Sequence, residues 1–255
     1  MKEFLGFGGY SRAAEGYLSW QHLTFVTMLM AVMILLAVLL GKKNRLAQPN
    51  VKNRVLIWTA VAIDGLELFK IVILCLRSES MNPVLMNLPL FLCSIQLITI
   101  PMAAFCKGRL RNAALDFVCI FGILGAVLGT YGAGNNYSCY PVLSLDNVVS
   151  GLTHSISGFA ALYIMIAGFA PLKKQDIPIT CGILTGFCLC AWIANALLDS
   201  NYMFLVRGDG TPYDILFNLV GGNPVVYPLC VIGLFFLYIT GFYAVHFQIR
   251  KKSKV

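Results

Sequence analysis

Charged residues are scarce in this sequence, and their scarcity excludes an ordinary soluble domain. Asp, Glu, Lys and Arg make up 12% of the 255 residues, about half of the roughly 25% that soluble globular chains carry. Hydrophobic residues make up 58%, and the mean hydropathy is +0.78. These values predict an all-α, polytopic membrane protein. Because its spans would share one lipid-facing belt, we expect residues 1–255 to form a single transmembrane domain.

Motifs for soluble ligands are also lacking. The sequence contains no phosphate-binding P-loop, no dinucleotide-binding glycine fingerprint and no zinc-type spacing of Cys and His. We therefore expect no soluble cofactor and no metal. The net charge of +8 does not indicate nucleic acid, because the basic residues form short clusters between apolar runs, as in cytoplasmic loops. The cysteines lie mostly within apolar runs, so we expect no disulfide framework.

Long apolar runs, in contrast, recur along the whole chain. An α-helix needs about 20 apolar residues to cross roughly 30 Å of hydrocarbon. Seven runs of this kind predict a seven-transmembrane-helix bundle, with spans at residues 21–41, 55–77, 85–106, 114–133, 150–171, 178–198 and 224–247. The connection before the last span is longer than the others. Its segment DILFNLV is expected to lie on the membrane surface or to dip into the membrane.

Basic residues fall into every second connection, and this alternation predicts the orientation. These connections and the C-terminal tail hold most of the Lys and Arg residues, namely Lys42, Lys43, Arg45, Lys52, Arg54, Lys107, Arg109, Arg111, Lys173, Lys174, Arg250, Lys251, Lys252 and Lys254. Cytoplasmic loops are enriched in Lys and Arg. The pattern therefore predicts an outside N-terminus, a cytoplasmic C-terminus and a multi-pass protein of the cell membrane.

Ionisable residues inside the predicted spans are few, and such residues are costly in a bilayer unless they are paired or functional. In the second span, Asp64, Glu67 and Lys70 are spaced by three, so they share one broad face of a helix. Glu67 can pair with Lys70, which leaves Asp64 in need of a donor. A structural ion pair that locks the bundle is an equally weighted interpretation.

Other polar side chains occur in four more spans. The third span contributes Cys93 and Gln96, the sixth contributes Asn195, and Tyr227 lies near the outer end of the seventh. His154, near the start of the fifth span, shares a helix stripe with two serines at positions 150 and 157.

These side chains are expected at comparable depths. At 1.5 Å per residue, Lys70 lies about 10 Å below the outer end of its span, Cys93 about 12 Å and His154 about 6 Å, and Asn195 is expected in the same outer half. We therefore expect a polar cavity in the outer half of the bundle. For His154, a packing residue satisfied by its neighbours remains an equal alternative.

Glycines are grouped in the fourth span. Gly125 and Gly129 form a GxxxG step, and Gly122 lies one turn earlier. Small residues with this spacing let helices approach closely in lipid. The alternative is that glycine is simply common in membrane helices.

Four short segments together resemble a known family. LPLFLCSIQ, LTHSISG, NYMFL and GGNPVVYP, in this order and placement, resemble the YwaF-like bacterial membrane proteins, which are related to eukaryotic transmembrane protein 164. The resemblance covers about residues 20–248. The eukaryotic relative looks like a lipid acyltransferase that uses a cysteine and a histidine.

The resemblance implies specific roles, with one departure. It implies Cys93 as the acylated nucleophile and His154 as the assisting base. A thiolate is a strong nucleophile, and a nearby imidazole generates it and later protonates the leaving group. In the eukaryotic pattern, however, the cysteine directly follows the proline and precedes a histidine, where this chain has Leu90 and Phe91. Cys93 lies nearly one turn deeper.

Two main hypotheses follow. The first is an acyltransferase or hydrolase of membrane lipids, with Cys93 or Ser94 as nucleophile and His154 as base. The remaining candidate residues would bind substrate: Gln96 and Asn195 as oxyanion donors, Glu67 and Lys70 at the head group, and Asp64 and Tyr227 nearby. The second is a transporter or binding protein for a small solute, although no inverted repeat is evident. A purely structural membrane subunit is a third possibility, and the sequence leaves the oligomeric state open.

Overall fold

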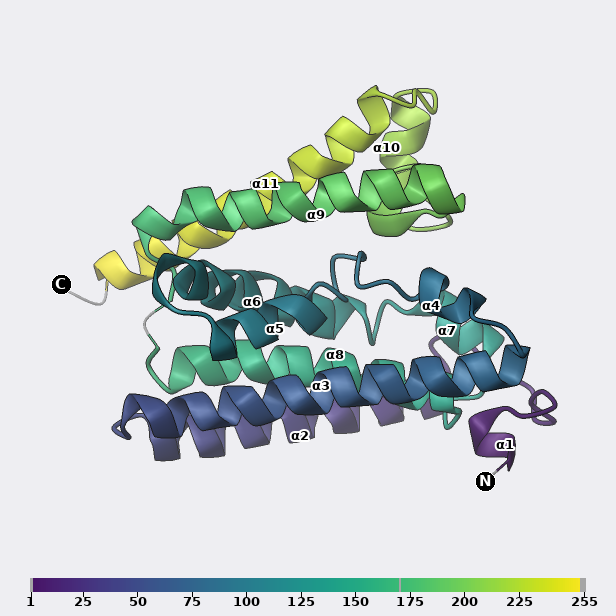
Figure 1. The fold of residues 1–255 in the computed structure, drawn as a ribbon, viewed down its shortest axis with the longest axis horizontal. Helices are drawn as coiled ribbons and strands as arrows, with labels where there is room; N and C mark the ends of the chain where they lie inside the picture. Colours follow the sequence, from purple (N-terminus) through teal and green to yellow (C-terminus); the bar gives the residue numbers. More distant parts are fainter. Residues whose placement is uncertain (1, 170, 253–255) are drawn as a thin grey trace.

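The computed structural model describes residues 2–169 and 171–252. Ala170 of the fifth predicted span and Lys254 of the predicted basic tail lie outside the described residues. Within the described ranges the chain forms helices and connections without a strand, so the all-α prediction is confirmed (Figure 1). The helices are α1 (Lys2–Leu5), α2 (Trp20–Asn44), α3 (Pro49–Ser78), α4 (Asn82–Met86), α5 (Gln96–Phe105), α6 (Gly108–Leu128), α7 (Gly134–Cys139), α8 (Leu145–Ile166), η1 (Lys174–Asp176), α9 (Ile177–Leu198), η2 (Tyr202–Phe204), α10 (Tyr213–Leu219) and α11 (Val226–Lys252).

Among the described residues, five helices are long and apolar enough to cross a membrane: α2, α6, α8, α9 together with η1, and α11. The sequence predicts seven such helices. α3 has 30 residues, or about 45 Å at 1.5 Å per residue, so its length also suffices. It differs from the five because Asp64, Glu67 and Lys70 interrupt its apolar sequence. The described part of the chain is thus a multi-pass membrane protein with five apolar spanning helices.

The third predicted span, residues 85–106, is not one helix. α4 and α5 are separated by residues 87–95, which form turns. Pro89 lacks a backbone donor and disfavours the helical conformation at Leu88. The prediction of a continuous helix is therefore wrong, and the interruption places Cys93 outside any helix.

α6 and α8 begin earlier than predicted, at Gly108 and Leu145. Ser144 caps α8 through its side chain, and such polar starts do not contribute to an apolar run. His154 therefore lies nine residues after the start of α8 (145 to 154), or about 14 Å along the helix. This is deeper than predicted and similar to the depth of Lys70, which precedes the end of α3 by eight residues (70 to 78).

α6 and α8 form the centre of the bundle, with α2, α3 and α5 packed around them (Figure 1). The two central helices approach closely at Gly122, where a Cβ atom would lie 2.7 Å from the backbone carbonyl oxygen of Ser157. Only glycine permits this approach. Buried apolar residues of α3, α5, α6 and α8, including Leu56, Ile100 and Val118, fill the adjoining core.

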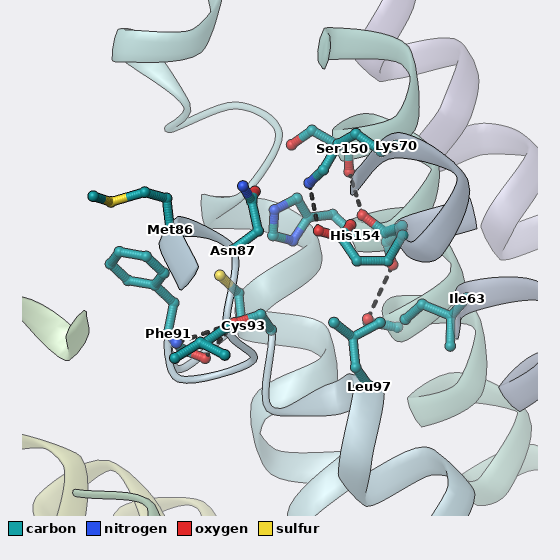
Figure 2. A pocket seen from close by; sticks show the side chains of 14 residues that line it. Ile63, Lys70, Met86, Asn87, Phe91, Cys93, Leu97, Ser150 and His154 are labelled. Carbon is teal, nitrogen blue, oxygen red and sulfur yellow. Dashed lines mark hydrogen bonds and ion pairs between the residues drawn. The ribbon is translucent and has the colours of Figure 1, made fainter. Parts of the chain in front are cut away.

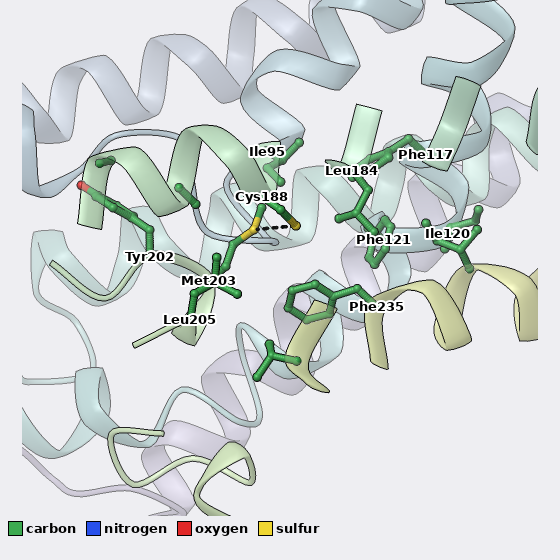
Figure 3. Close-up of a cluster of buried hydrophobic side chains, with 14 of the residues drawn as sticks. Ile95, Phe117, Ile120, Phe121, Leu184, Cys188, Tyr202, Met203, Leu205 and Phe235 are labelled. Atoms are coloured by element: carbon green, nitrogen blue, oxygen red, sulfur yellow. Dashed lines mark hydrogen bonds between the residues drawn. The ribbon is translucent and has the colours of Figure 1, made fainter. Parts of the chain in front are cut away.

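α9, α10 and α11 form a second layer beside α6 (Figure 1). Its contact with the centre is apolar: Phe117 and Phe121 of α6 belong to the same buried cluster as Leu184 and Cys188 of α9 and Phe235 of α11 (Figure 3). The rings of Phe117 and Phe121 lie 4.6 Å apart. Burial of these aromatic side chains fixes the second layer against the centre.

The connections gather at two ends of the bundle (Figure 1). The α2–α3, α5–α6 and α8–α9 connections lie at the same end as the last turns of α11. We call it the basic end, because it carries the clustered Lys and Arg residues. The N-terminus, α4, α7 and α10 lie at the opposite end.

The N-terminal segment is fastened to the end opposite the basic one. Arg77 of α3 pairs with Asp146 of α8 (2.8 Å), and the hydroxyl of Tyr10 donates to the same carboxylate (2.6 Å). Burial, together with this hydrogen bond to Asp146, raises the pKa of Tyr10 to about 12. Tyr10 therefore stays protonated at neutral pH and keeps donating. These contacts join the N-terminal segment, α3 and α8.

Candidate functional site

A cavity of about 140 Å³ lies between α3, residues 87–95, α5 and α8 (Figure 2). Glu67 and Lys70 of α3, Cys93 of the broken span and His154 of α8 all line it. Met86 also lines the cavity and is 59% exposed, so this wall borders the exterior of the protein. One water molecule needs about 10–15 Å³ of such volume. The cavity therefore has room for several waters or for the polar part of a larger ligand.

Cys93 lies in a turn with unused backbone donors. The hydroxyl of Ser94 accepts a hydrogen bond from the N–H of Phe91 (3.0 Å) and donates to the Phe91 carbonyl (3.1 Å). Within the described part of the chain, the N–H groups of Leu92, Cys93 and Ser94 donate to no backbone carbonyl. Those of Cys93 and Ser94 interact with the Sγ of Cys93. Free N–H groups that converge beside a nucleophile can bind a developing oxyanion.

The imidazole of His154 faces the same cavity. Figure 2 shows the side chain of Cys93 and this ring at the same cavity. The ring forms no hydrogen bond with any described residue, Cys93 included. Because a neutral imidazole has one donor and one acceptor nitrogen, both are available to a ligand or to a thiol that moves closer.

Two glycines of α6 lie against this pair of side chains. A Cβ atom on Gly129 would collide with the ring of His154, because the three nearest atoms all belong to the imidazole. A Cβ atom on Gly125 would lie 3.5 Å from the Cβ of Cys93, an ordinary van der Waals distance. Gly129 therefore provides the space that the imidazole occupies, whereas Gly125 tolerates a methyl group.

A charged pair forms another wall of the cavity. Lys70 Nζ lies 2.5 Å from Glu67 Oε1, and the two side chains are 15% and 13% exposed. Their contact satisfies each charge in an environment where an unpaired one would be costly. The residues described here include no group of three or more His, Cys, Asp or Glu side chains arranged to hold a metal ion.

Two of the predicted site residues lie in the second layer instead. The side-chain oxygen of Asn195 accepts hydrogen bonds from the Tyr202 N–H (2.6 Å) and the Ser200 hydroxyl (3.0 Å), and its amide donates to the Tyr202 carbonyl (3.0 Å). Asn195 thus fastens the end of α9 to η2. Tyr227 is buried beside Phe217, with ring centroids 5.1 Å apart, and its hydroxyl has no partner among the described residues.

Gln96 and Asp64 lie near the cavity in sequence but do not line it. Gln96 is fully buried; its Oε1 accepts from the hydroxyl of Thr99 (3.1 Å), and its Nε2 has no partner in the described ranges. Asp64 is half-buried, and its Oδ1 has no partner there either. The predicted depths of these residues do not specify which side of the helix they occupy.

Asn87 and Phe91 line the cavity, although the sequence did not mark them as site residues. Both belong to the segment that was predicted to continue a helix. The available signal was Asn87 two residues before Pro89, because an Asn followed by a nearby proline indicates a turn.

Comparison with known proteins places the chain in a family. Residues 17–244 match the TMEM164 family. The chain belongs to the TMEM164 family. This confirms the expected relation to transmembrane protein 164. The matched TMEM164 region contains every residue that lines the cavity. No curated protein and no solved structure matches the chain.

Membership of the TMEM164 family agrees with the apolar helices. Together they identify an integral, multi-pass membrane protein. The family match begins near the start of α2 and ends within α11, so both helical layers belong to it.

Proposed function

We propose that this TMEM164 family protein cleaves an acyl chain from a membrane lipid and passes it to another lipid or to water, with Cys93 as nucleophile and His154 as base. The observation that carries this proposal is that the side chains of Cys93 and His154 line one cavity (Figure 2). The exposed side chain of Met86 on the cavity wall supports entry of a lipid from outside the bundle.

In the first step His154 takes the thiol proton of Cys93, and the sulfur attacks the ester carbonyl carbon of the lipid. The carbon–oxygen bond of the ester breaks, and the imidazolium gives its proton to the departing lysolipid oxygen. The acyl chain remains on Cys93 as a thioester, and His154 is neutral again.

In the second step a hydroxyl group of a lysolipid or of water attacks the thioester. His154 takes the hydroxyl proton, the carbon–sulfur bond breaks, and the proton returns to the sulfur. A lysolipid acceptor makes the protein an acyltransferase, and water makes it a hydrolase. The cavity volume suits the reacting ester and the attacking hydroxyl, so the acyl chains would extend outside it.

The oxyanion of both steps would be bound by backbone N–H groups. The sequence points to Gln96 and Asn195 for this task, but neither lines the cavity, and Asn195 makes three hydrogen bonds elsewhere. The N–H groups of Cys93 and Ser94, which donate to no backbone carbonyl of the described residues, are better placed, because they adjoin the attacking sulfur. Such preorganised donors lower the barrier without reorganising in the transition state.

Glu67 and Lys70 would orient the lipid head group. The ammonium of Lys70 suits a phosphate oxygen, and the carboxylate of Glu67 suits a cationic amine. Both lie at the cavity wall within reach of the same ligand. Membrane lipids are therefore the partners that we propose.

We also propose seven crossings, with α3 and the segment from α4 to α5 added to the five apolar helices. The basic end would face the cytoplasm of the cell membrane, which places the cavity toward the outer leaflet and the N-terminus outside. All helices would form one domain. Within the family, we propose that the chain belongs to the YwaF-like bacterial group, on the four segments described above.

The experiment compares the lipid profiles of cells that express wild-type protein or single variants at equal levels. Cys93→Ala and His154→Ala should each abolish the change in acyl composition, a loss of about 10²–10⁴-fold as expected for a catalytic base or nucleophile. Cys181→Ala and His246→Ala are matched controls, because both residues are partly buried and lie outside the cavity. A hydroxylamine-sensitive acyl group should be found on Cys93 by mass spectrometry. Unchanged lipids in cells with wild-type protein, or full activity of both cavity variants, would overturn the proposal.

A transporter or binding protein for a small solute is the competing proposal. The half-buried carboxylate of Asp64, with Oδ1 unpaired among the described residues, favours it. The test is solute uptake by vesicles that contain the purified protein. Saturable uptake that Asp64→Asn abolishes would support a transporter, and the absence of any uptake would contradict the transporter proposal.

A further inference from the structure

A second hollow lies at the basic end of the bundle, away from the Cys93 cavity. It has a volume of about 350 Å³ and is lined by the start of α3, the end of α5 and the start of α6. Small-molecule sites range from roughly 300 to 1,000 Å³. The hollow is therefore large enough for a ligand, and none of its lining residues takes part in the function proposed above.

Arg111 of α6 is held rigidly in this hollow. Its Nε donates to the Ala103 carbonyl (3.0 Å), and one terminal nitrogen donates to the Asn53 side chain (2.9 Å). The guanidinium also lies over the ring of Phe169, 5.7 Å from its centroid. A guanidinium has five N–H groups, and these contacts use only two nitrogens. The remaining N–H groups are preorganised to bind an anion.

The charge of the hollow is not compensated. Lys107 and Arg111 line it, no Asp or Glu does, and neither cation forms an ion pair within the part of the chain that the structure describes. α6 begins here at Gly108 without a side-chain cap and without an acidic residue in its first turn. The first N–H groups of the helix add partial positive charge at the same place.

We propose that this hollow binds a phosphate group. A planar guanidinium, a lysine ammonium and free helix N–H groups together match the charge and the oxygen geometry of phosphate. The phosphate could belong to an anionic lipid head group or to a soluble phosphate compound. Basic pockets between membrane helices on the cytoplasmic side are known to bind anionic head groups.

The test uses the purified full-length protein in a neutral detergent. Dioleoyl-phosphatidylglycerol is titrated and binding is measured by native mass spectrometry, with dioleoyl-phosphatidylcholine as the zwitterionic comparison. In a second arm, inorganic phosphate binding is measured by equilibrium dialysis. Lys107→Gln and Arg111→Gln remove charges from the hollow. Arg109→Gln is the matched control, because Arg109 is exposed, lies in the same turn of α6 and bonds the Gln175 carbonyl outside the hollow.

The proposal expects saturable binding of phosphatidylglycerol, of phosphate or of both, which Lys107→Gln and Arg111→Gln each weaken by about tenfold. Arg109→Gln should change it by less than about twofold, because the Arg109 guanidinium donates to the Gln175 carbonyl and does not line the hollow. Arg111→Gln also removes hydrogen bonds to Ala103 and Asn53 that hold the helices. If the Arg111 variant is unstable, the result for Lys107→Gln decides the test. Equal weakening by Lys107→Gln and Arg109→Gln would indicate nonspecific attraction and overturn the site. Absence of saturable binding in both arms would overturn it as well.

Discussion

The cavity around His154 and the junction around Asn195 both contain polar side chains of predicted membrane spans, yet they differ in hydrogen bonding. The side-chain amide of Asn195 forms three hydrogen bonds within the protein. His154 makes no hydrogen bond with the described residues, and it lines the same cavity as Cys93. Asn195 therefore holds the chain together, whereas the imidazole of His154 is available to a ligand.

The difference teaches that polarity inside a membrane span does not by itself identify a site. A buried polar group needs a hydrogen-bond partner. The partner is either another group of the same protein or a ligand that enters the cavity. Replacing a residue of the first kind should reduce stability, whereas replacing one of the second kind should reduce activity. The four predictions below test that separation.

The largest expected effect is on activity, from Gly129→Ala. The added methyl group would occupy the position of the imidazole, so His154 must swing away from Cys93. We expect the specific activity to fall about 100-fold, or about 2.7 kcal/mol of barrier. Gly125→Ala is the control, because its methyl group meets Cys93 at an ordinary contact distance, and it should keep most of its activity. Equal activities would show that the glycine does not position the ring.

The second effect is on stability, from Asn195→Ala. The change removes three hydrogen bonds and leaves the N–H of Tyr202 unpaired. We expect the free energy of unfolding to fall by about 2 kcal/mol. This is measured by denaturant titration of the detergent-solubilised protein. At low temperature the folded variant should keep wild-type activity; a large loss of activity there would place Asn195 in the site after all.

A smaller effect is expected on substrate binding, from Lys70→Met. The variant keeps the length of the side chain but removes the ammonium that faces the cavity. We expect KM to rise about fivefold, or about 1 kcal/mol, with little change in kcat. Glu67→Gln serves as the partner variant, because it breaks the ion pair while leaving the ammonium. A fall in kcat with unchanged KM would contradict a role in head-group binding.

The smallest effect is expected for the exposed pair of Arg207 and Asp209, whose atoms lie 2.6 Å apart. Burial opposes ionisation of Asp209, but hydrogen bonds from Asn201 and Arg207 outweigh it and lower its pKa. Its contribution is therefore present above about pH 4, the ordinary Asp value, and is lost as the pH falls through the lowered pKa. Arg207→Ala should change stability by less than about 0.5 kcal/mol. A larger change at neutral pH would give this loop a structural role.

The long helices were predictable because apolar length is the main requirement for crossing a bilayer. The runs that became α2, α9 and α11 match their predicted spans within a few residues. The break at residues 87–95 was missed because the surrounding sequence is apolar, and apolar runs do not distinguish helix from buried turn. The proline at position 89 was the local sign of it.

For the site, counting residues along each helix predicted depth but not direction. It grouped Glu67, Lys70, Cys93 and His154 at comparable depths, and the structure places them around one cavity, with His154 deeper than predicted. It included Asn195 at the same level, although that side chain turns toward η2. Which way a side chain faces depends on how the helices are rotated against one another, and the positions of single residues do not record this rotation.

The break in the third span has a consequence for how heat would inactivate the protein. Backbone groups that lack helical hydrogen bonds need other partners in a membrane. Tyr202 of η2 supplies some of them: its hydroxyl donates to the Leu85 carbonyl and accepts from the Leu88 N–H. The loop between α9 and α10 thus covers the segment that carries Cys93. If Cys93 is the nucleophile, as proposed, warming that detaches this loop would let Cys93 move while the long helices are still intact, so activity would be lost before the fold.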